Sequence, residues 1–308
     1  MTTAILLVIT LLVVPLISYL FGTAPGESEW EAIHTLLIIL GVAVAYAFIV
    51  GELSGNNSQV DKLWSILPIV YAWVVASFGD FSPRLVLMSV LVTLWGVRLT
   101  TNFALKGAFS WRFWAGEEDY RWPLLRQKPE FKPRWRWTLF NLFFISGYQL
   151  TLILLFTLPM IIALQFNSVP LGIFDWVVAG LMLFFIGFET VADIQQWNFQ
   201  SKKWAKIRAG EKLTGDYQKG FLDKGLWAYS RHPNYLAEQA IWVCFYLFSI
   251  PASGEWFNWS IAGCLLLIVL FQGSSQFSEE ISEGKYPEYS DYQKRVPRFF
   301  PRGRKTVS

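Results

Sequence analysis

The residues with the clearest chemical potential lie in segment 225–242, which reads GLWAYSRHPNYLAEQAIW. Glu238 falls in its apolar part. A charged side chain at the centre of a membrane-spanning helix costs roughly 2.5 to 3.5 kcal/mol, so it needs a partner or a function. Pro233 suits the first position of a helix, because its missing N–H is not needed there. A helix from Pro233 places Asn234 and Glu238 on one face, and its N-terminal amide groups favour phosphate or carboxylate.

Two residues of this turn have competing interpretations. Arg231 offers a guanidinium group that matches phosphate geometry, and anchoring of basic loops on the cytoplasmic side explains it nearly as well. His232 is one of two histidines. A histidine beside proline is more often a turn residue than an acid or a ligand. The sequence leaves both interpretations open.

A second polar group precedes this segment. Glu189, Asp193, Gln196 and Gln200 are spaced by four, three and four residues, which places them on one face of a helix. Glu189 follows the apolar run VVAGLMLFFIGF. An acid at that depth implies an internal cavity or a cationic partner.

Further polar side chains collect near the ends of apolar segments. They are Asp61, Lys62, Arg98, the cluster Glu117, Glu118, Asp119, Tyr120 and Arg121, and the acids Glu279, Glu280 and Glu283, which precede KYPEYSDYQKRVPRFFP. Together they predict a water-accessible cavity lined by acids, amides and aromatic rings beneath basic loops. Such a cavity suits an anionic, aromatic cofactor from water and a lipidic substrate from the bilayer. The sequence has no Walker loop, strand-linked GxGxxG, HExxH helix or GxSxG elbow.

The elements that position these residues are membrane helices. The chain has 308 residues, of which 54% are hydrophobic and only 16% charged, and this is too apolar for a soluble domain of that length. A span needs about 20 apolar residues. This criterion predicts an all-α polytopic bundle of about eight spans, with a range of seven to nine. They lie near 4–22, 32–51, 63–79, 84–101, 138–165, 172–193, 236–252 and 256–277.

The loops predict the orientation of the bundle. Lys and Arg concentrate in 106–136, 202–231 and 285–305, whereas the alternate connections hold several acids and border on one Arg, Arg84. The positive-inside rule then places the three basic segments, both termini and the opening of the cofactor pocket in the cytoplasm. The net charge of +3 is mostly a topology signal, and we expect a multi-pass protein of the cell membrane without a nucleic-acid partner.

The chain reads as one integral membrane domain, 1–308. Residues 4–22 lack a basic leading region and a small-residue cleavage site, so we expect a retained helix. Cys244 and Cys264 both fall inside predicted spans, without a His or Asp cluster, and indicate neither a disulfide framework nor a metal site. The oligomeric state has no sequence signal.

The segment that opens this section resembles a known signature. Its matching residues are Gly225, Leu226, Trp227, Tyr229, Pro233, Asn234, Tyr235, Glu238, Trp242 and Tyr246. In type and spacing they resemble the C-terminal signature of the steroid 5-alpha-reductases. The likeness is closer still to an uncharacterised bacterial branch of that superfamily, domain of unknown function 1295. The shared patterns are ExxxDxQ, an EDYRW-like loop, SRHPNYxxE and YxxYQKRVPxFFP, within about 59–301.

The resemblance implies an NADPH-binding oxidoreductase of lipid metabolism. In the steroid enzymes the matching Asn, Tyr and Glu line the NADPH pocket, and an acid of the preceding helix helps to hold the cofactor. The residues expected at the cofactor are Arg98, Arg121, Glu189, Asp193, Gln196, Tyr229, Arg231, His232, Asn234, Tyr235, Glu238, Glu280 and Tyr289. The implied reaction transfers hydride to the β carbon of an activated alkene in a steroid-like, isoprenoid or fatty substrate.

The N-terminal half departs from the steroid enzymes, which polarise the substrate ketone with a Glu and a Tyr three residues before an Arg. If Arg98 is that Arg, the Tyr position holds Trp95, which has no phenolic proton. Asp61 loosely matches the Glu. We therefore expect Asp61, or Tyr120 of the EDYRW loop, to supply the polarising group.

Two other functions compete with this interpretation. The isoprenylcysteine carboxyl methyltransferases, which use S-adenosylmethionine, also show an Arg-His-Pro-x-Tyr turn and an acidic pair before a Tyr-rich, Val-Pro ending. Asn234 and Glu238 match the reductase spacing better. A transporter or scaffold would also hold intramembrane acids, but transporters usually place ionisable groups near the midplane and often show repeated halves. Here the polar residues crowd one side and the sequence shows no repeat.

Overall fold

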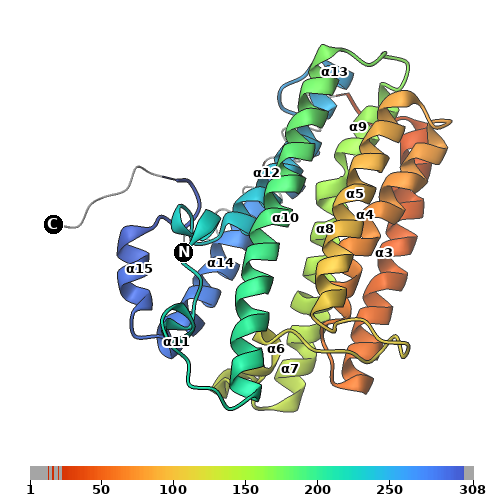
Figure 1. The fold of residues 1–308 in the computed structure, drawn as a ribbon. Coiled ribbons are helices and arrows are strands. Elements are labelled where there is room, and N and C mark those ends of the chain that lie inside the picture. The colour runs from red at the N-terminus through yellow and green to blue at the C-terminus, as the bar shows by residue number, and fades with distance from the viewer. Residues whose placement is uncertain (1–12, 14–15, 17–19, 21–22, 302–308) are drawn as a thin grey trace. The chain divides into compact units, whose positions relative to one another are not determined.

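The computed structural model describes residues 13, 16, 20 and 23–301, and regular structure in this part of the chain is helical throughout (Figure 1). The long helices are α3 (Glu27–Ser54), α4 (Gln59–Phe78), α5 (Pro83–Leu105), α10 (Ile173–Arg208), α12 (Pro233–Leu247) and α14 (Ile261–Lys285). Between α5 and α10 the chain forms α6 (Arg121–Arg126), η2 (Pro129–Phe131), α7 (Arg134–Phe140), the π-helical η3 (Asn141–Tyr148), α8 (Gln149–Thr157) and α9 (Pro159–Gln165). The short C-terminal elements are α11 (Asp216–Lys219), η4 (Gly225–Ala228), α13 (Ser249–Ser253) and α15 (Tyr289–Arg295).

Seven helical stretches in the described part are long and apolar enough to cross a membrane. They are Glu27–Ser54, Gln59–Phe78, Pro83–Leu105, Arg134–Gln165, Ile173–Arg208, Pro233–Ser253 and Ile261–Lys285. Each coincides with a predicted span, so the prediction of a polytopic membrane bundle is confirmed. The predicted span 4–22 falls almost wholly outside the described residues. The cell membrane as location and the cytoplasmic termini stay predictions.

Contacts divide the chain into two compact units. The first unit comprises 1–179 and 244–266, and the second comprises 180–243 and 267–308. The boundaries fall within α10, α12 and α14. The candidate residues Asp61, Arg98, Tyr120 and Arg121 belong to the first unit, and the other candidate residues belong to the second.

The core of the first unit includes a close contact between α4 and α5. Tyr71 of α4 and Met88 and Trp95 of α5 are fully buried. A Cβ added at Gly96 of α5 would lie 2.6 Å from the carbonyl oxygen of Ser65 in α4. Small residues permit such close backbone approach in membrane bundles. Trp95 therefore lies in the tightly packed interior of this unit.

A buried ion pair joins the start of α5 to the start of α10. Arg84 Nε donates to Asp175 Oδ1 at 2.8 Å, and Arg84 Nη2 donates to Asp175 Oδ2 at 3.0 Å. The carbonyl oxygens of Val169 and Pro170 accept the remaining bonds, each at 3.0 Å. The two charged side chains are 2% and 0% exposed. A buried pair is tolerated when its donors are satisfied in this way, and this one fixes the connection that leads into α10.

We expect Asp175→Asn to lower the free energy of unfolding by about 3–5 kcal/mol, because it leaves the Arg84 charge buried without a counter-charge. Thermal unfolding of the purified protein in detergent measures the effect. The control is Glu211→Gln, which breaks the exposed pair with Lys206 and should change the midpoint little. The double variant Arg84→Met with Asp175→Leu should recover part of the loss. Equal shifts for Asp175→Asn and Glu211→Gln would contradict the role of the buried pair.

Candidate functional site

The segment that leads into α12 is seated on α10 within the second unit. The Leu226 N–H donates to Gln195 Oε1 at 3.0 Å, and Trp227 Nε1 donates to the Ala192 carbonyl at 3.1 Å. Gly225 has a φ of +63°, and a Cβ there would lie 2.5 Å from Gln195 Oε1. Glycine is required at this position because it tolerates the left-handed conformation and leaves room for the amide.

The C-terminal segment holds the turn before Pro233. The N–H of Arg231 donates to the Pro297 carbonyl at 3.0 Å, and that of His232 donates to the Arg298 carbonyl at 3.1 Å. The helix then begins at Pro233, which confirms the predicted start. The ending of the chain thus helps to set where α12 begins.

Glu279 of α14 is the charged centre of this region. Its carboxylate accepts from Arg231 Nε at 2.8 Å and from Arg231 Nη2 at 3.1 Å. His232 Nε2 lies 2.9 Å from the same carboxylate, and Arg298 Nη2 lies 3.5 Å from it. We call Glu279, Arg231, His232 and Arg298 the Glu279 clamp. Glu279 is 3% exposed and His232 is 5% exposed, so water screens these contacts weakly.

The clamp gives Arg231 a structural role. Besides its bonds to Glu279, Arg231 Nη1 donates to the carbonyls of Gln293, at 3.0 Å, and Val296. All three guanidinium nitrogens are therefore engaged inside the protein. The predicted contact of Arg231 with cofactor phosphate stays a prediction.

The sequence interpretation selected Glu280, whereas the structure points to its neighbour. Glu280 is exposed and accepts a bond from Gln276. Glu279 lies four residues after the fully buried Ser275 and twelve residues after the fully buried Leu267, so it continues the buried side of α14. This helical phase was the available signal, because it places only one of the two acids on the buried face.

Residues of two sequence motifs meet between α10 and α12. Asn234 Nδ2 donates to Asp193 Oδ1 at 3.2 Å. Glu238 is 4% exposed and accepts from Trp242 Nε1 at 3.1 Å, and Glu189 is also 4% exposed. We call Glu189, Asp193, Gln196, Asn234 and Glu238 the polar face. It offers several hydrogen-bond acceptors within the second unit.

The aromatic candidates differ in their surroundings. The Tyr235 ring stacks on His232 with centroids 5.2 Å apart. Tyr229 is 52% exposed. Tyr289 is buried in an aromatic cluster with Phe221 and Tyr292. Tyr289 therefore supports the packing of the C-terminal segment, and its predicted contact with the cofactor stays a prediction.

The two catalytic candidates lie in the first unit. Asp61, at the start of α4, accepts from Trp122 Nε1 at 2.9 Å and lies 3.9 Å from Arg121 Nη2. Arg121 Nε also donates to Asp119 at 2.7 Å. Burial alone would raise the pKa of Asp119, but the charge and hydrogen bonds of Arg121 hold it below its ordinary value. Tyr120 is 50% exposed.

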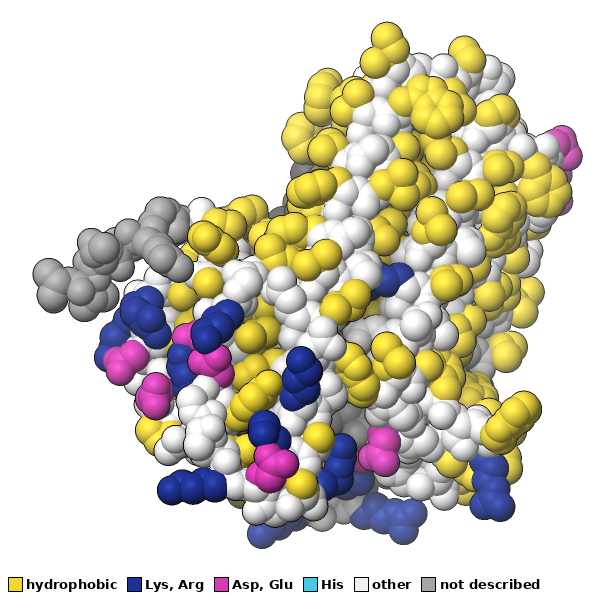
Figure 2. All heavy atoms as spheres, in the orientation of Figure 1, with side chains coloured by type: hydrophobic (Ala, Val, Ile, Leu, Met, Phe, Trp, Pro, Cys, Tyr) yellow, Lys and Arg dark blue, Asp and Glu magenta, His cyan; other side chains and the backbone are white. Residues whose placement is uncertain are grey.

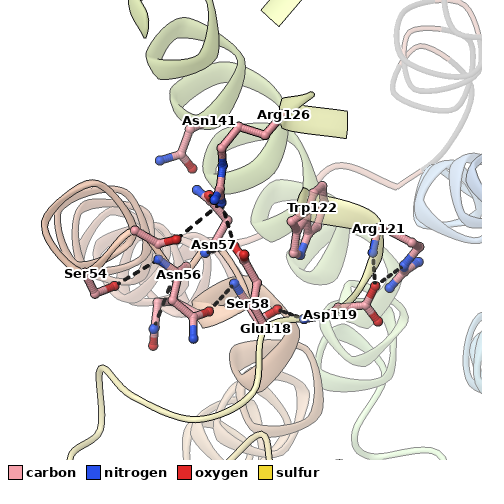
Figure 3. Close-up of polar contacts among 12 residues, drawn as sticks. Ser54, Asn56, Asn57, Ser58, Glu118, Asp119, Arg121, Trp122, Arg126 and Asn141 are labelled. Carbon is pink, nitrogen blue, oxygen red and sulfur yellow. Dashed lines mark hydrogen bonds and ion pairs between the residues drawn. The ribbon is translucent and has the colours of Figure 1, made fainter. Parts of the chain in front are cut away.

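The same loop covers the turn between α3 and α4 (Figure 3). Glu118 Oε1 accepts from the Asn57 N–H and from Arg126 Nη2, both at 2.8 Å. The Asp119 N–H donates to Ser58 Oγ at 2.8 Å. Sequence reasoning flagged the acids but missed Asn57, Ser58 and Arg126, because nothing in the sequence links these distant segments. The acids of the loop are thus largely committed to contacts within the protein.

Comparison with known proteins assigns the chain to a family. Residues 47–296 match the family described as "Protein of unknown function (DUF1295)". The chain belongs to the DUF1295 family. An uncharacterized protein of Schizosaccharomyces pombe is 38% identical over 279 residues, which cover 85% of this chain and 79% of the yeast protein. No solved structure matches the chain. The predicted likeness to the DUF1295 family is confirmed, and the link of this family to the steroid 5-alpha-reductases stays a prediction.

In this DUF1295 protein we expect Glu279→Gln to lower the free energy of unfolding by about 3–5 kcal/mol, because Arg231 stays buried without its counter-charge. Thermal unfolding measures the loss, and trypsin cleavage after Lys294 or Arg295 should accelerate as the C-terminal segment loosens. Glu280→Gln is the matched control, since it changes an exposed acid one residue away. If the two variants behave alike, the clamp does not hold this region.

His232 makes stability depend on pH. Burial lowers the pKa of His232, and the hydrogen bond with Glu279 offsets this only in part. The unfolded chain therefore binds more protons than the folded protein below about pH 6.5. The contribution of His232 to stability is complete above that pH and falls as the pH drops towards its folded-state pKa.

Unfolding midpoints measured between pH 5 and pH 8 test this dependence. His232→Gln should flatten the acid limb of the curve. His34→Gln, which changes the exposed second histidine, should leave the curve as it is. A wild-type curve that rises as the pH falls would show the opposite sign.

Proposed function

We propose that this protein is a membrane-embedded, NADPH-dependent oxidoreductase that reduces an activated C=C bond of a lipidic substrate. Its motifs resemble those of the steroid 5-alpha-reductases, in which the matching residues bind NADPH. The observation that carries the proposal is the bond between Asn234 and Asp193. It joins the ExxxDxQ and SRHPNYxxE motifs, to which the resemblance assigns the cofactor.

The polar face fits the nicotinamide and ribose parts of such a cofactor. These parts present amide N–H and hydroxyl donors, and the face offers carboxylates and amide oxygens. The Oε1 atom of Gln196 is buried without a hydrogen-bond partner among the described residues. An unsatisfied buried acceptor costs about 1–3 kcal/mol, so a ligand donor at this atom fits well. When bound, NADPH would supply the hydride.

The residues of the chain would then act by orientation and by exclusion of water. The Glu279 clamp fixes the turn from which Asn234 and Glu238 project. Trp242 orients the Glu238 carboxylate through its indole N–H. Because Glu238 is nearly fully buried, its interaction with a ligand donor would be stronger than the same contact in water.

Of the two proposed polarising groups, Asp61 has the better surroundings. Its side chain is 13% exposed and is bonded by Trp122, whereas half of the Tyr120 surface is open. A group that polarises a carbonyl works best where water is excluded. This comparison supports Asp61 as the polarising residue.

A second candidate function is an S-adenosylmethionine-dependent methyltransferase of the isoprenylcysteine carboxyl type. The residues of the clamp favour it, because Arg231, His232 and Glu279 belong to the turn and the acidic pair of that pattern. The clamp is thus compatible with both functions. Asn234 and Glu238 distinguish them, since they match the reductase spacing.

NADPH should stabilise the purified protein in detergent. At about 100 times its dissociation constant a ligand adds about 2.7 kcal/mol, which raises the unfolding midpoint by roughly 5 °C for a chain of this size. Glu238→Gln and Asn234→Ala should lose most of this shift. Glu283→Gln, which changes an exposed acid of α14, should retain it.

Stabilisation by S-adenosylmethionine alone would favour the methyltransferase, and no response to either ligand would favour a transporter or scaffold. A membrane lipid extract incubated with the protein and NADPH provides the test of chemistry. We expect a lipid whose mass increases by two hydrogens, and no such product with Glu238→Gln.

A further inference from the structure

Two segments of the first unit, 111–114 and 132–136, carry exposed aromatic and basic side chains. These are Trp111, Arg112, Phe113, Trp114, Lys132, Arg134, Trp135 and Arg136, and we call the two segments together the aromatic–basic surface. The side chain of Trp111 is fully exposed, and Trp135 is 62% exposed. Large rings in water are unfavourable, so this exposure requires an explanation.

The backbone of segment 113–115 is held by side chains of α4. The Nζ atom of Lys62 donates to the carbonyls of Phe113, at 3.0 Å, and Ala115, at 2.7 Å. Gln59 Nε2 donates to the Trp114 carbonyl at 3.1 Å. Lys62 is 6% exposed. Because α4 holds residues 113–115 by their carbonyl oxygens, the backbone of this part of the loop is fixed on the start of α4, and moving it would break these three part-buried hydrogen bonds.

The charge of the surface is positive. Segment 106–136 contains eight Lys and Arg and four acids. Two of the acids, Glu118 and Asp119, are paired with Arg126 and Arg121. In contrast, Arg112, Lys132 and Arg134 form no ion pair within the described part of the chain. Figure 2 shows Lys and Arg side chains along the lower part of the view, where Figure 1 places α6 and α7 among other elements.

Segment 111–114 lies between two membrane spans, and segment 132–136 reaches the start of the second of them. The helix α5 ends at Leu105, and the next span begins at Arg134, so the loop is at the level of the lipid headgroups. Indole rings prefer this interface, and each Lys or Arg near an anionic membrane surface contributes about 1 kcal/mol. We propose that the aromatic–basic surface binds the headgroups of anionic phospholipids. This inference is independent of the proposed reductase function.

Quenching of tryptophan fluorescence by brominated lipids tests the proposal. The protein is reconstituted into nanodiscs of phosphatidylcholine that contain a fixed fraction of either brominated phosphatidylglycerol or equally brominated phosphatidylcholine. The difference between wild type and Trp111→Phe isolates the signal of Trp111. We expect stronger quenching by the phosphatidylglycerol probe. The double variant Arg112→Glu with Arg134→Glu should lower this preference at least about fivefold, given the contribution of each charge.

Arg208→Glu is the matched control, because it reverses an exposed charge outside the surface and should leave the preference intact. Equal quenching of Trp111 by both probes in the wild type would overturn the proposal, since it shows contact without selection for charge. An absence of quenching by either probe would also overturn it.

Retention of phosphatidylglycerol by the detergent-purified protein, counted by native mass spectrometry, provides a second measurement. Wild type should retain more of this lipid than the double variant, and equal retention would contradict the proposal. Both measurements use only protein that elutes as a single folded species.

Discussion

The second unit depends on one buried carboxylate. Glu279 neutralises Arg231, which would otherwise be a buried charge without compensation, and it also contacts His232. These two residues immediately precede α12, so the direction of this helix is tied to α14 and to the end of the chain. Asn234 and Glu238 lie within the first two turns of α12. The geometry of the polar face therefore follows from the clamp, whichever ligand the face binds.

The first unit uses the same physical solution at another helix entry. Arg84 pairs with Asp175 and donates its remaining bonds to backbone carbonyls of the segment before α10. Arg231 does likewise with Glu279 and the carbonyls of Gln293 and Val296 at the end of α15. In both cases one guanidinium group neutralises a buried carboxylate and also donates hydrogen bonds to backbone carbonyls of a neighbouring segment. Arginine suits this task because its donors form a rigid, planar fork.

Hydropathy and helical period predicted the spans, the entry at Pro233 and the common helix of Glu189 and Asp193, because each depends on neighbours in sequence. The partners of Arg231 depend on tertiary structure, since a basic residue in a loop has the same local pattern whether it binds phosphate or Glu279. Helical periodicity could have distinguished Glu279 from Glu280, because only one of them can lie on the buried face of α14. That distinction requires a residue known to be buried nearby, such as Ser275.

The EDYRW loop has two sides with different requirements. Its inner side places Trp122 on Asp61 and commits Asp119 to Arg121, which keeps the proposed polarising carboxyl away from bulk water. Its outer side presents Trp111 and Arg112, and Lys62 holds that part by its backbone carbonyls. Lys62 and Asp61 are adjacent at the start of α4. The residues that hold the loop against this helix therefore also limit the access of water to Asp61. A change that loosens the loop would also change the environment of Asp61.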